Sequence, residues 1–251
     1  MQLTGNTVLI TGGTSGIGRA LAEQFHLRGN RVVIAGRRRH LLDDITARHP
    51  GMRGLDVDVE NPAALDAFVA RVREEVPDLD VLVNNAGISR QEDLTAESVD
   101  IAVQMSIIQT NIIGVLHLTA ALLPTLKRRP RATILTTTSG LAFVPRGNFP
   151  TYCASKAFLH SWSQSLRVQL RDTSVEVLEL APPYVQTELA GPASATDPAA
   201  MPLAAFIAEV MHILGGPSIP GGEILVERVK PLRWAERNGT YEHLFGALNP
   251  R

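Results

Sequence analysis

The sequence predicts an α/β fold built as a single domain on one doubly wound parallel sheet, with helices on both faces. Short apolar runs recur at 7–11, 31–36, 80–87, 132–139 and 175–183. Uninterrupted runs of this length are typical of parallel strands that are buried on both faces. Longer amphipathic stretches separate the runs, and this repeated strand-then-helix order produces parallel strands with helices packed over the sheet.

The helices are predicted from the apolar period and from the residues that precede them. One helix over Gly18–Leu27 follows the first run, and a second covers Ala63–Val76. Asn61 and Pro62 precede the second helix as its cap and first-turn residue, positions that favour these residue types. Helices therefore alternate with strands from the start of the chain.

Two segments depart from this alternation. Residues 187–205 begin with a stretch rich in Pro, Ala and Gly, and we expect a mobile loop on the substrate side of the sheet, although a plain surface connection fits the same composition. From Pro231 onward we expect one terminal helix, which carries Trp234, Tyr241 and Phe245 and serves packing or contact between subunits.

Composition excludes several classes of function. The 24 basic residues nearly balance 25 acidic ones, so no nucleic acid is expected as a partner. No signal-like start and no run of about eighteen uninterrupted apolar residues are found, so neither export nor a membrane is expected. One cysteine, Cys153, supplies neither a disulfide nor a metal cluster, and it favours a reducing, cytoplasmic setting with no metal.

The first strand leads into a glycine-rich turn, Thr11–Gly18, followed by a helix. Glycines allow the backbone to turn tightly and to approach a pyrophosphate, while the helix N-terminus offers free N–H groups. A tight strand-to-helix connection without any ligand is the alternative. The position after the first strand favours a dinucleotide site of the Rossmann type.

The end of the second strand indicates which dinucleotide is bound. NAD-binding folds usually place an acidic residue there, to hold the ribose hydroxyls, but this chain has Arg37, Arg38 and Arg39. Guanidinium groups match a 2′-phosphate through charge-assisted hydrogen bonds. NADP(H) is therefore favoured over NAD(H), with Arg37 as the first candidate, against the alternative that these are solvated residues at a helix start.

Four polar residues form a candidate catalytic set. Tyr152 and Lys156 lie four residues apart and so share one face of a helix, where the lysine charge favours ionisation of the phenol. Ser139 ends a strand at the edge where α/β sheets bind ligands, although it could simply cap the next turn. Asn111 lies among apolar neighbours and needs a hydrogen-bonding partner. Each residue alone is weak evidence.

With the glycine turn, these residues carry a resemblance to the short-chain dehydrogenase/reductase family over nearly the whole chain. The matching motifs are TGGTSGIG at 11–18, Asp58-Val59, NNAG at 84–87, Asn111, Ser139 and YCASK at 152–156. Some stretches, such as TSGLAFVP, are similar to a subgroup labelled by association with D-alanine esterification of teichoic acid. That label names a pathway and does not identify a substrate.

The resemblance implies a role for each matched position. Tyr152 would be the general acid/base, Lys156 would lower its pKa and bind the nicotinamide ribose, Ser139 would orient the substrate oxygen, and Asn111 would hold a water in a proton relay. The implied cofactor contacts are Gly12, Thr14, Ser15, Gly16, Ile17, Gly18, Arg37, Arg38, Asp58, Val59, Asn85, Ala86, Gly87, Tyr152, Lys156, Val185 and Thr187. The family usually has Pro-Gly where this chain has Pro182-Pro183, so the nicotinamide end is the part in doubt.

The expected function is hydride transfer between NADP(H) and a small-molecule carbonyl or alcohol. An alcohol dehydrogenase that uses NAD in the oxidising direction is one alternative, and a non-catalytic dinucleotide-sensing protein is another. The residue pattern does not identify the substrate. The helices that hold Asn111 and Tyr152 are apolar on more than one side, which predicts a homodimer or homotetramer, as the family resemblance does.

Overall fold

Buried β-branched and leucine side chains on both faces of the strands place the sheet at the centre of the molecule. The computed structural model describes residues 1–250. The strands are β1 (Thr7–Thr11), β2 (Arg31–Gly36), β3 (Arg53–Asp56), β4 (Val81–Asn84), β5 (Ala132–Thr137), β6 (Val175–Leu180) and β7 (Glu223–Ile224). They form one sheet in the order β3-β2-β1-β4-β5-β6-β7, and every neighbouring pair is parallel. The predicted doubly wound α/β fold is confirmed.

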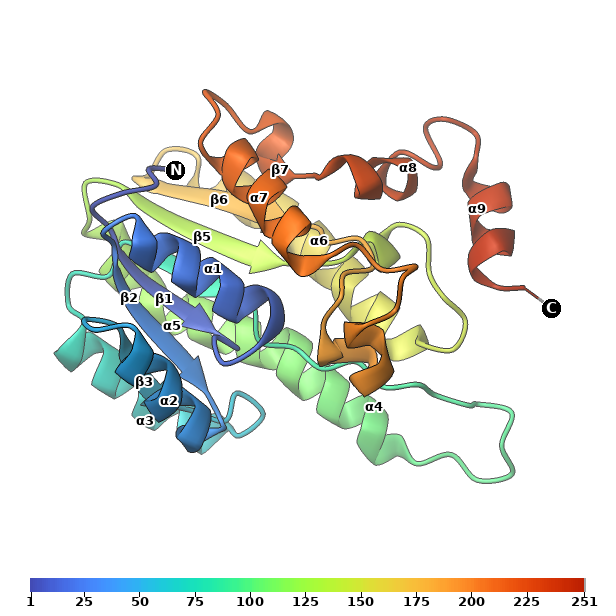
Figure 1. Ribbon diagram of the computed structural model, residues 1–251, viewed down its shortest axis with the longest axis horizontal. Helices are drawn as coiled ribbons and strands as arrows, with labels where there is room; N and C mark the ends of the chain where they lie inside the picture. The colour runs from blue at the N-terminus through green and yellow to red at the C-terminus, as the bar shows by residue number, and fades with distance from the viewer. Residues whose placement is uncertain (251) are drawn as a thin grey trace.

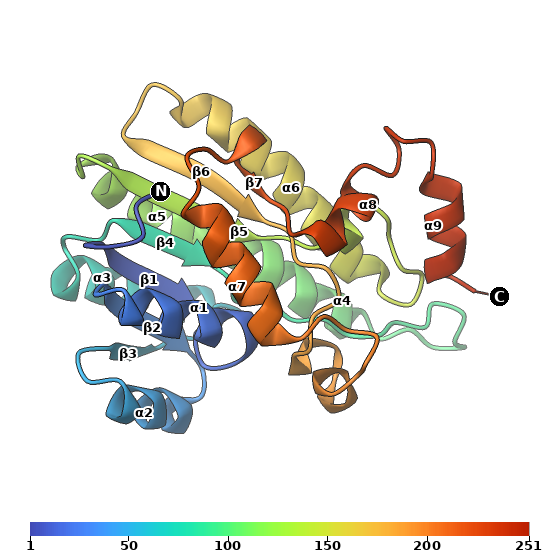
Figure 2. The ribbon, with the colours of Figure 1, turned by 45° about the horizontal axis from the view of Figure 1, so that its top comes forward.

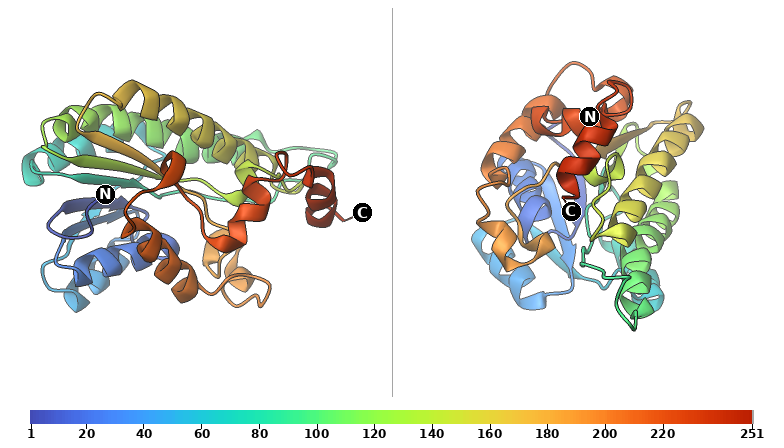
Figure 3. Two further views of the ribbon diagram at one scale, coloured as in Figure 1. Left: turned by 90° about the horizontal axis from the view of Figure 1, so that it is seen from above. Right: turned by 90° about the vertical axis from the view of Figure 1, so that its right-hand side faces the viewer.

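The helices cover the two faces of this sheet (Figure 1). Their bounds are α1 (Gly16–Leu27), α2 (Arg39–Arg48), α3 (Pro62–Glu75), α4 (Ile101–Ile108), α5 (Gly114–Lys127), α6 (Pro150–Leu170), α7 (Leu203–Leu214), α8 (Lys230–Arg233) and α9 (Tyr241–Leu248). Helices α1, α2 and α7 lie on one face, and α3, α5 and α6 lie on the other (Figure 3). The order in which strands are added to the sheet changes direction between β1 and β4. Such sheets bind ligands at this switch point, at the carboxyl ends of the strands.

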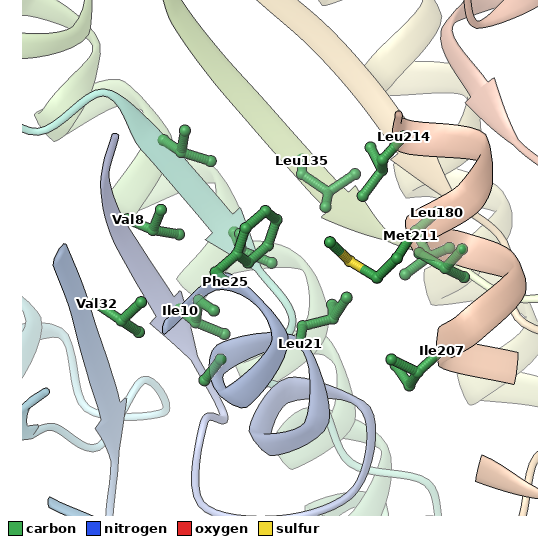
Figure 4. Close-up of a cluster of buried hydrophobic side chains, with 14 of the residues drawn as sticks. Val8, Ile10, Leu21, Phe25, Val32, Leu135, Leu180, Ile207, Met211 and Leu214 are labelled. Carbon is green, nitrogen blue, oxygen red and sulfur yellow. The ribbon is translucent and has the colours of Figure 1, made fainter. Parts of the chain in front are cut away.

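Each face has its own hydrophobic core, because successive strand residues point to opposite sides. Val8 and Ile10 pack under α1 and α7, whereas Leu9 packs under α3 and α5. Phe25 of α1 is fully buried among strand and α7 side chains (Figure 4). The two cores hold the strands in one register and so hold their carboxyl ends in one line.

The structure corrects the prediction at the sheet edges and strand ends. Strands β3 and β7 were not predicted, because one is the short polar sequence RGLD and the other has only two residues. The fourth, fifth and sixth strands end at Asn84, Thr137 and Leu180, three residues or so before the apolar runs do. The remaining residues of those runs leave the sheet and line the cleft described below.

The single terminal helix predicted from Pro231 is wrong. The structure has the short α8, then turns, then α9. Gly239 has a positive φ of +67°, a left-handed conformation that ends a helical path and that glycine adopts readily. As a result α9 stands at the edge of the molecule (Figure 2), and none of its residues is buried.

Helices α4 and α5 run on through the π-helical turn η1 (Gln109–Ile113) to make one long apolar stretch. In the part of the chain that the structure describes, this stretch, Ile101–Lys127, is the one helix long and apolar enough to cross a membrane by length and composition alone. Core helices pass the same test, and 44% of its most apolar window is buried inside the protein.

The segment expected to be a mobile loop contains two 3-10 turns, η3 (Glu188–Ala190) and η4 (Pro192–Ala195), before α7 begins at Leu203. Its two ends meet in a bridge between Val185 and Met201. The Ser194 hydroxyl donates to the carbonyl of Thr187, and the Gln186 amide donates to the carbonyl of Asp197. The segment is therefore closed at its base.

Replacing Phe25 with Ala should lower the free energy of unfolding by about 3–5 kcal/mol, because the change leaves a cavity between α1, the sheet and α7. Leu27→Ala on the same helix is the matched control, since Leu27 is 72% exposed, and its effect should stay within about 0.5 kcal/mol. Urea unfolding of both variants measures the difference. Equal losses would contradict this account of the core.

Candidate active site

A cleft of about 530 Å³ opens along the carboxyl ends of the strands. It lies at β1 and β4, where the order in which strands are added to the sheet changes direction. Ligand pockets usually fall in this range of volume. The sequence-predicted residues Gly12, Thr14, Ser15, Gly16, Ile17, Arg37, Arg38, Asp58, Val59, Asn85, Ala86, Gly87, Ser139, Tyr152, Lys156, Val185 and Thr187 all line it. The cleft thus brings together every predicted residue except Gly18 and Asn111, which contact lining residues from behind.

The glycine turn lies so close to the end of β4 that side chains at two of its positions would collide. A Cβ on Gly12 would lie 2.9 Å from the Ala86 Cα, and Gly12 also has a positive φ of +66°. A Cβ on Gly18 would lie 2.4 Å from the Asn85 side-chain nitrogen and 2.4 Å from the Gly12 carbonyl oxygen. Only glycine allows this close approach, and the turn leads into the N-terminus of α1, whose free N–H groups suit a pyrophosphate.

Thr11 joins this turn to the following strand end. Its hydroxyl accepts hydrogen bonds from the backbone N–H groups of Asn85 and Ala86, each at 3.1 Å, and donates to the Val83 carbonyl. The Asn85 side chain donates back to the Thr11 carbonyl at 3.1 Å. These bonds hold the turn and the NNAG segment as one rigid floor beneath the cleft.

Arg38, rather than Arg37, reaches over the glycine turn. Its guanidinium donates to the hydroxyls of Ser15 at 2.7 Å and Thr14 at 3.0 Å. The Arg37 guanidinium instead lies 4.0 Å from an Asp58 oxygen and 3.9 Å from Glu60. Arg38 and the two hydroxyls therefore lie together beside the turn. Arg37, the first candidate from the sequence, is instead near the carboxylates of Asp58 and Glu60.

Tyr152 occupies the first turn of α6, with its side chain in the cleft. The helix start is held by Glu92, whose carboxylate accepts from the Thr151 N–H at 2.9 Å and from its hydroxyl at 2.7 Å. Tyr152 is only 6% exposed, and burial raises the pKa of its phenol to about 12, although the neighbouring Ser139 hydroxyl opposes that rise. The phenol is consequently protonated at neutral pH.

Ser139 follows β5 and lines the cleft beside Tyr152. Its Oγ also accepts a hydrogen bond from the Leu141 N–H at 3.1 Å, which caps the 3-10 turn η2 (Gly140–Ala142). The capping alternative raised from the sequence is therefore present together with the position in the cleft. Because the Oγ accepts from the backbone, its own proton is free to be donated into the cleft.

Lys156 lies one turn beyond Tyr152 and is 4% exposed. Its ammonium donates to the Thr137 carbonyl at 2.9 Å and sits 5.7 Å from the centre of the Tyr152 ring. Burial lowers the pKa of Lys156 to about 8. The ammonium thus lies over the Tyr152 ring, and burial is the largest influence on the pKa of both side chains.

Asn111 lies in the π-helical turn η1 and is fully buried. Its Oδ1 accepts from the Ile88 N–H at 2.9 Å, and its Nδ2 donates to the Ile88 carbonyl and to the Ser155 hydroxyl, each at 3.0 Å. All the bonds found for this side chain are with protein. The buried Asn111 amide therefore finds its hydrogen-bonding partners in Ile88, from the loop after β4, and in Ser155 of α6. Through these bonds Asn111 ties the loop to the helix behind Lys156.

The segment after β6 completes the cleft at the position where the family motif is altered. Pro182 and Pro183 both line it, and the Pro182 carbonyl accepts from the Gly140 N–H at 2.8 Å. A Cβ added to Gly16 would lie 3.2 Å from the Thr187 methyl group, so this segment approaches the glycine turn closely. Pro183 removes one backbone donor there, while Val185 and Thr187 keep theirs.

Sequence reasoning missed a buried polar cluster behind the site. The Nδ1 of His160 lies 2.8 Å from Glu179, a fully buried carboxylate that also accepts from the Thr138 hydroxyl at 2.7 Å. His160, Glu179 and Glu223 offer ligand atoms within 4.8 Å of one another. Arg233 makes two hydrogen bonds to Glu223, so the cluster's charges already have protein partners. The alternation of strand residues could have flagged Glu179, because it occupies an apolar position.

Comparison with known proteins agrees with this arrangement. The model of the short chain dehydrogenase family matches residues 6–198. A Bacillus subtilis (strain 168) protein named uncharacterized oxidoreductase DltE is 41% identical over 251 residues, covering 99% of this chain and 98% of that protein.

Solved structures give the same result. A short-chain dehydrogenase from Sphingobium yanoikuyae in complex with NADPH is 27% identical with a TM-score of 0.80, covering 96% of this chain and 95% of that one. A 3-ketoacyl-(acyl-carrier-protein) reductase from Brucella melitensis, complexed with NADH, is 27% identical with a TM-score of 0.77, covering 89% and 97%. The chain therefore belongs to the short-chain dehydrogenase/reductase family of oxidoreductases.

Proposed function

We propose that the protein is an NADP(H)-dependent reductase that converts a small carbonyl compound to the alcohol, with Tyr152 as the proton donor. The observation that carries the proposal is the meeting of Tyr152, Lys156 and Ser139 with the glycine turn in one cleft. NADPH, when bound, supplies the hydride to the carbonyl carbon. The bare glycine turn and Arg38 would hold its pyrophosphate and 2′-phosphate.

The protein's own residues manage the proton. Because burial raises the pKa of Tyr152 to about 12, the phenol carries its proton at neutral pH and is ready to donate it to the carbonyl oxygen as that oxygen gains negative charge. Ser139 donates a second hydrogen bond to the same oxygen. Alcohol oxidation, the alternative, would use the same groups in reverse, with Tyr152 accepting the proton.

Lys156 and Asn111 support the proton donor. The Lys156 ammonium is held by the Thr137 carbonyl on the same helix face as Tyr152, where it would bind the nicotinamide ribose and stabilise the phenolate after proton transfer. Asn111 acts as a positioning residue, since its side chain fastens the loop after β4 to Ser155, next to Lys156.

NADP(H) is proposed over NAD(H) on the basis of the residues beside the turn. Three arginines, Arg37 to Arg39, and no acidic residue follow β2, and Arg38 donates to hydroxyls of the turn itself. A relative of known structure binds NADPH and another binds NADH, so the family alone does not decide the cofactor. The planar, doubly donating guanidinium matches a phosphate better than a ribose hydroxyl pair.

We also propose a homodimer or homotetramer, in a reducing compartment such as the cytoplasm. The surface of the long helix Ile101–Lys127 and of α6 exposes Met105, Ile113, Phe158 and Val168. Exposed apolar side chains gathered on neighbouring helices support contact with a second copy. The single thiol, Cys153, is buried and unpaired, which fits the compartment.

Replacing Tyr152 with Phe should lower kcat/KM for carbonyl reduction on the order of 100-fold or more, because the proton donor is lost while the ring still packs. The dissociation constant for NADPH should change little. Tyr241→Phe on the exposed α9 is the matched control and should keep full activity. NADPH oxidation with a carbonyl panel measures both variants, and full turnover by the Tyr152 variant would remove this mechanism.

Replacing Arg38 with Ser should weaken NADPH binding by about 10- to 100-fold and leave NADH binding nearly unchanged, because only NADPH has the phosphate that the guanidinium meets. Arg37→Ser should have a smaller effect, since Asp58 and Glu60 share its charge. Arg39→Ser, whose guanidinium pairs with Asp43 and Asp56, is the control. Fluorescence titration gives the constants, and a larger effect at Arg37 would reverse the assignment.

Replacing Lys156 with Met should make the protein more stable near pH 7, because a buried ammonium is costly to desolvate. The folded pKa of about 8 lies below the unfolded value of about 10.4, so wild type gains stability relative to the variant as pH rises between these values. The change should total on the order of 3 kcal/mol. Urea unfolding from pH 7 to 10.5 measures it, and a pH-independent difference would contradict the lowered pKa.

A further inference from the structure

The loop that joins Ser139 to Tyr152 brings a guanidinium to the substrate end of the cleft. Arg146 lies in this loop and lines the cleft, as does Arg90 from the loop after β4. Tyr152, Phe149 and Leu141 pack together in a small apolar cluster beneath the loop. The Arg146 guanidinium lies 5.9 Å from the centre of the Phe149 ring, at the rim of this cluster. The cation therefore lies against a residue of the cluster that contains Tyr152.

Arg146 is left without a carboxylate partner. Among residues 1–250 its side chain makes no hydrogen bond or ion pair. Glu92 and Asp197 make their hydrogen bonds elsewhere, since both Glu92 oxygens accept from Thr151 and Asp197 accepts from the Tyr184 hydroxyl. Arg146 is exposed where it lines the cleft, and an unpaired guanidinium there attracts anions and can bind a carboxylate through two parallel hydrogen bonds.

The backbone around Arg146 is held firmly to α6 and to the C-terminus. The Cys153 sulfur, next to Tyr152, accepts from the Arg146 N–H at 3.4 Å. Asn249, just after α9, accepts from the Gly147 N–H at 2.5 Å and donates to the Pro145 carbonyl at 3.1 Å, so it holds the residues on both sides of Arg146. Figure 2 shows α9 at this end of the molecule. The terminal helix, which buries no residue of its own, thus fixes the cation's loop.

We propose that the substrate is an oxo acid, whose carboxylate binds Arg146 while its carbonyl lies at Ser139 and Tyr152. The intervening surface is apolar, with Leu141, Phe149 and Leu248 in the lining, so it accommodates a short hydrocarbon segment between the two polar groups. Asn249 is a positioning residue for the same interaction. This proposal rests on the proposed reductase function, because the carbonyl must reach the proton donor.

Binding of the alcohol product, which cannot react with NADPH, tests the proposal without turnover. The probes are lactate, 3-hydroxybutyrate and mandelate, each paired with its methyl ester, titrated by calorimetry into NADPH-loaded protein. At least one acid should bind the wild type 10-fold or more tightly than its ester. Arg146→Gln should weaken binding of that acid by about 10- to 100-fold and leave ester binding unchanged.

Two further variants sharpen the test. Arg171→Gln removes an exposed arginine whose charge pairs with Asp172 outside the cleft, and it should change neither constant. Asn249→Ala should weaken acid binding several-fold without altering NADPH affinity, because the loop loses its anchor but the cation remains. If no acid binds better than its ester, or if Arg146→Gln leaves acid binding intact, the proposal is overturned.

The corresponding oxo acids and their methyl esters, offered as substrates with NADPH, separate the two proposals. Wild-type reduction of the oxo esters with no preference for the oxo acids would overturn the oxo acid proposal and leave the reductase standing. Tight, Arg146-dependent binding of an acid with no reduction of any oxo acid would support the carboxylate site and count against the reductase. Both sets of measurements use the full-length protein.

Discussion

The close approach of the glycine turn to the end of β4 is the constraint on which the site depends. Without side chains at Gly12 and Gly18, the turn reaches the backbone of Ala86 and the side chain of Asn85, and Thr11 bonds both backbone N–H groups there. The same contact joins β1 and β4, the two strands between which the strand order of the sheet changes direction. A methyl group at either glycine would therefore disturb both the floor of the cleft and the contact between the ends of β1 and β4.

Burial controls the chemistry at the other end of the cleft. Tyr152 and Lys156 share one helix face, and burial moves the pKa of each toward the neutral form, upward for the phenol and downward for the ammonium. Both shifts come from the same low-polarity surroundings. The cleft thus holds a protonated phenol next to an amine whose pKa is lowered.

The supporting contacts come from segments distant in sequence. Glu92 holds the start of α6, Asn111 fastens the loop after β4 to α6, and Asn249 fixes the loop that carries Arg146. Behind Ser139, the buried Glu179 pairs with His160 and Thr138. A buried carboxylate is tolerated only with such partners, and here they are Thr138, between β5 and Ser139, and His160 of α6, the helix that carries Tyr152 and Lys156.

The sequence by itself determined the parallel sheet, the glycine turn and the order of the polar residues along the cleft, because each depends on local pattern: apolar runs, a strand-to-helix turn and a four-residue helical spacing. Strands β3 and β7 were not predicted from the sequence, since short edge strands contain few apolar residues. Only the tertiary structure decided that Arg38 rather than Arg37 lies over the turn, that Lys156 sits over the Tyr152 ring, and that Glu179 and Asn249 hold distant segments. These outcomes depend on side-chain direction and on contacts across 20 to 100 or so residues of chain, which no local pattern encodes.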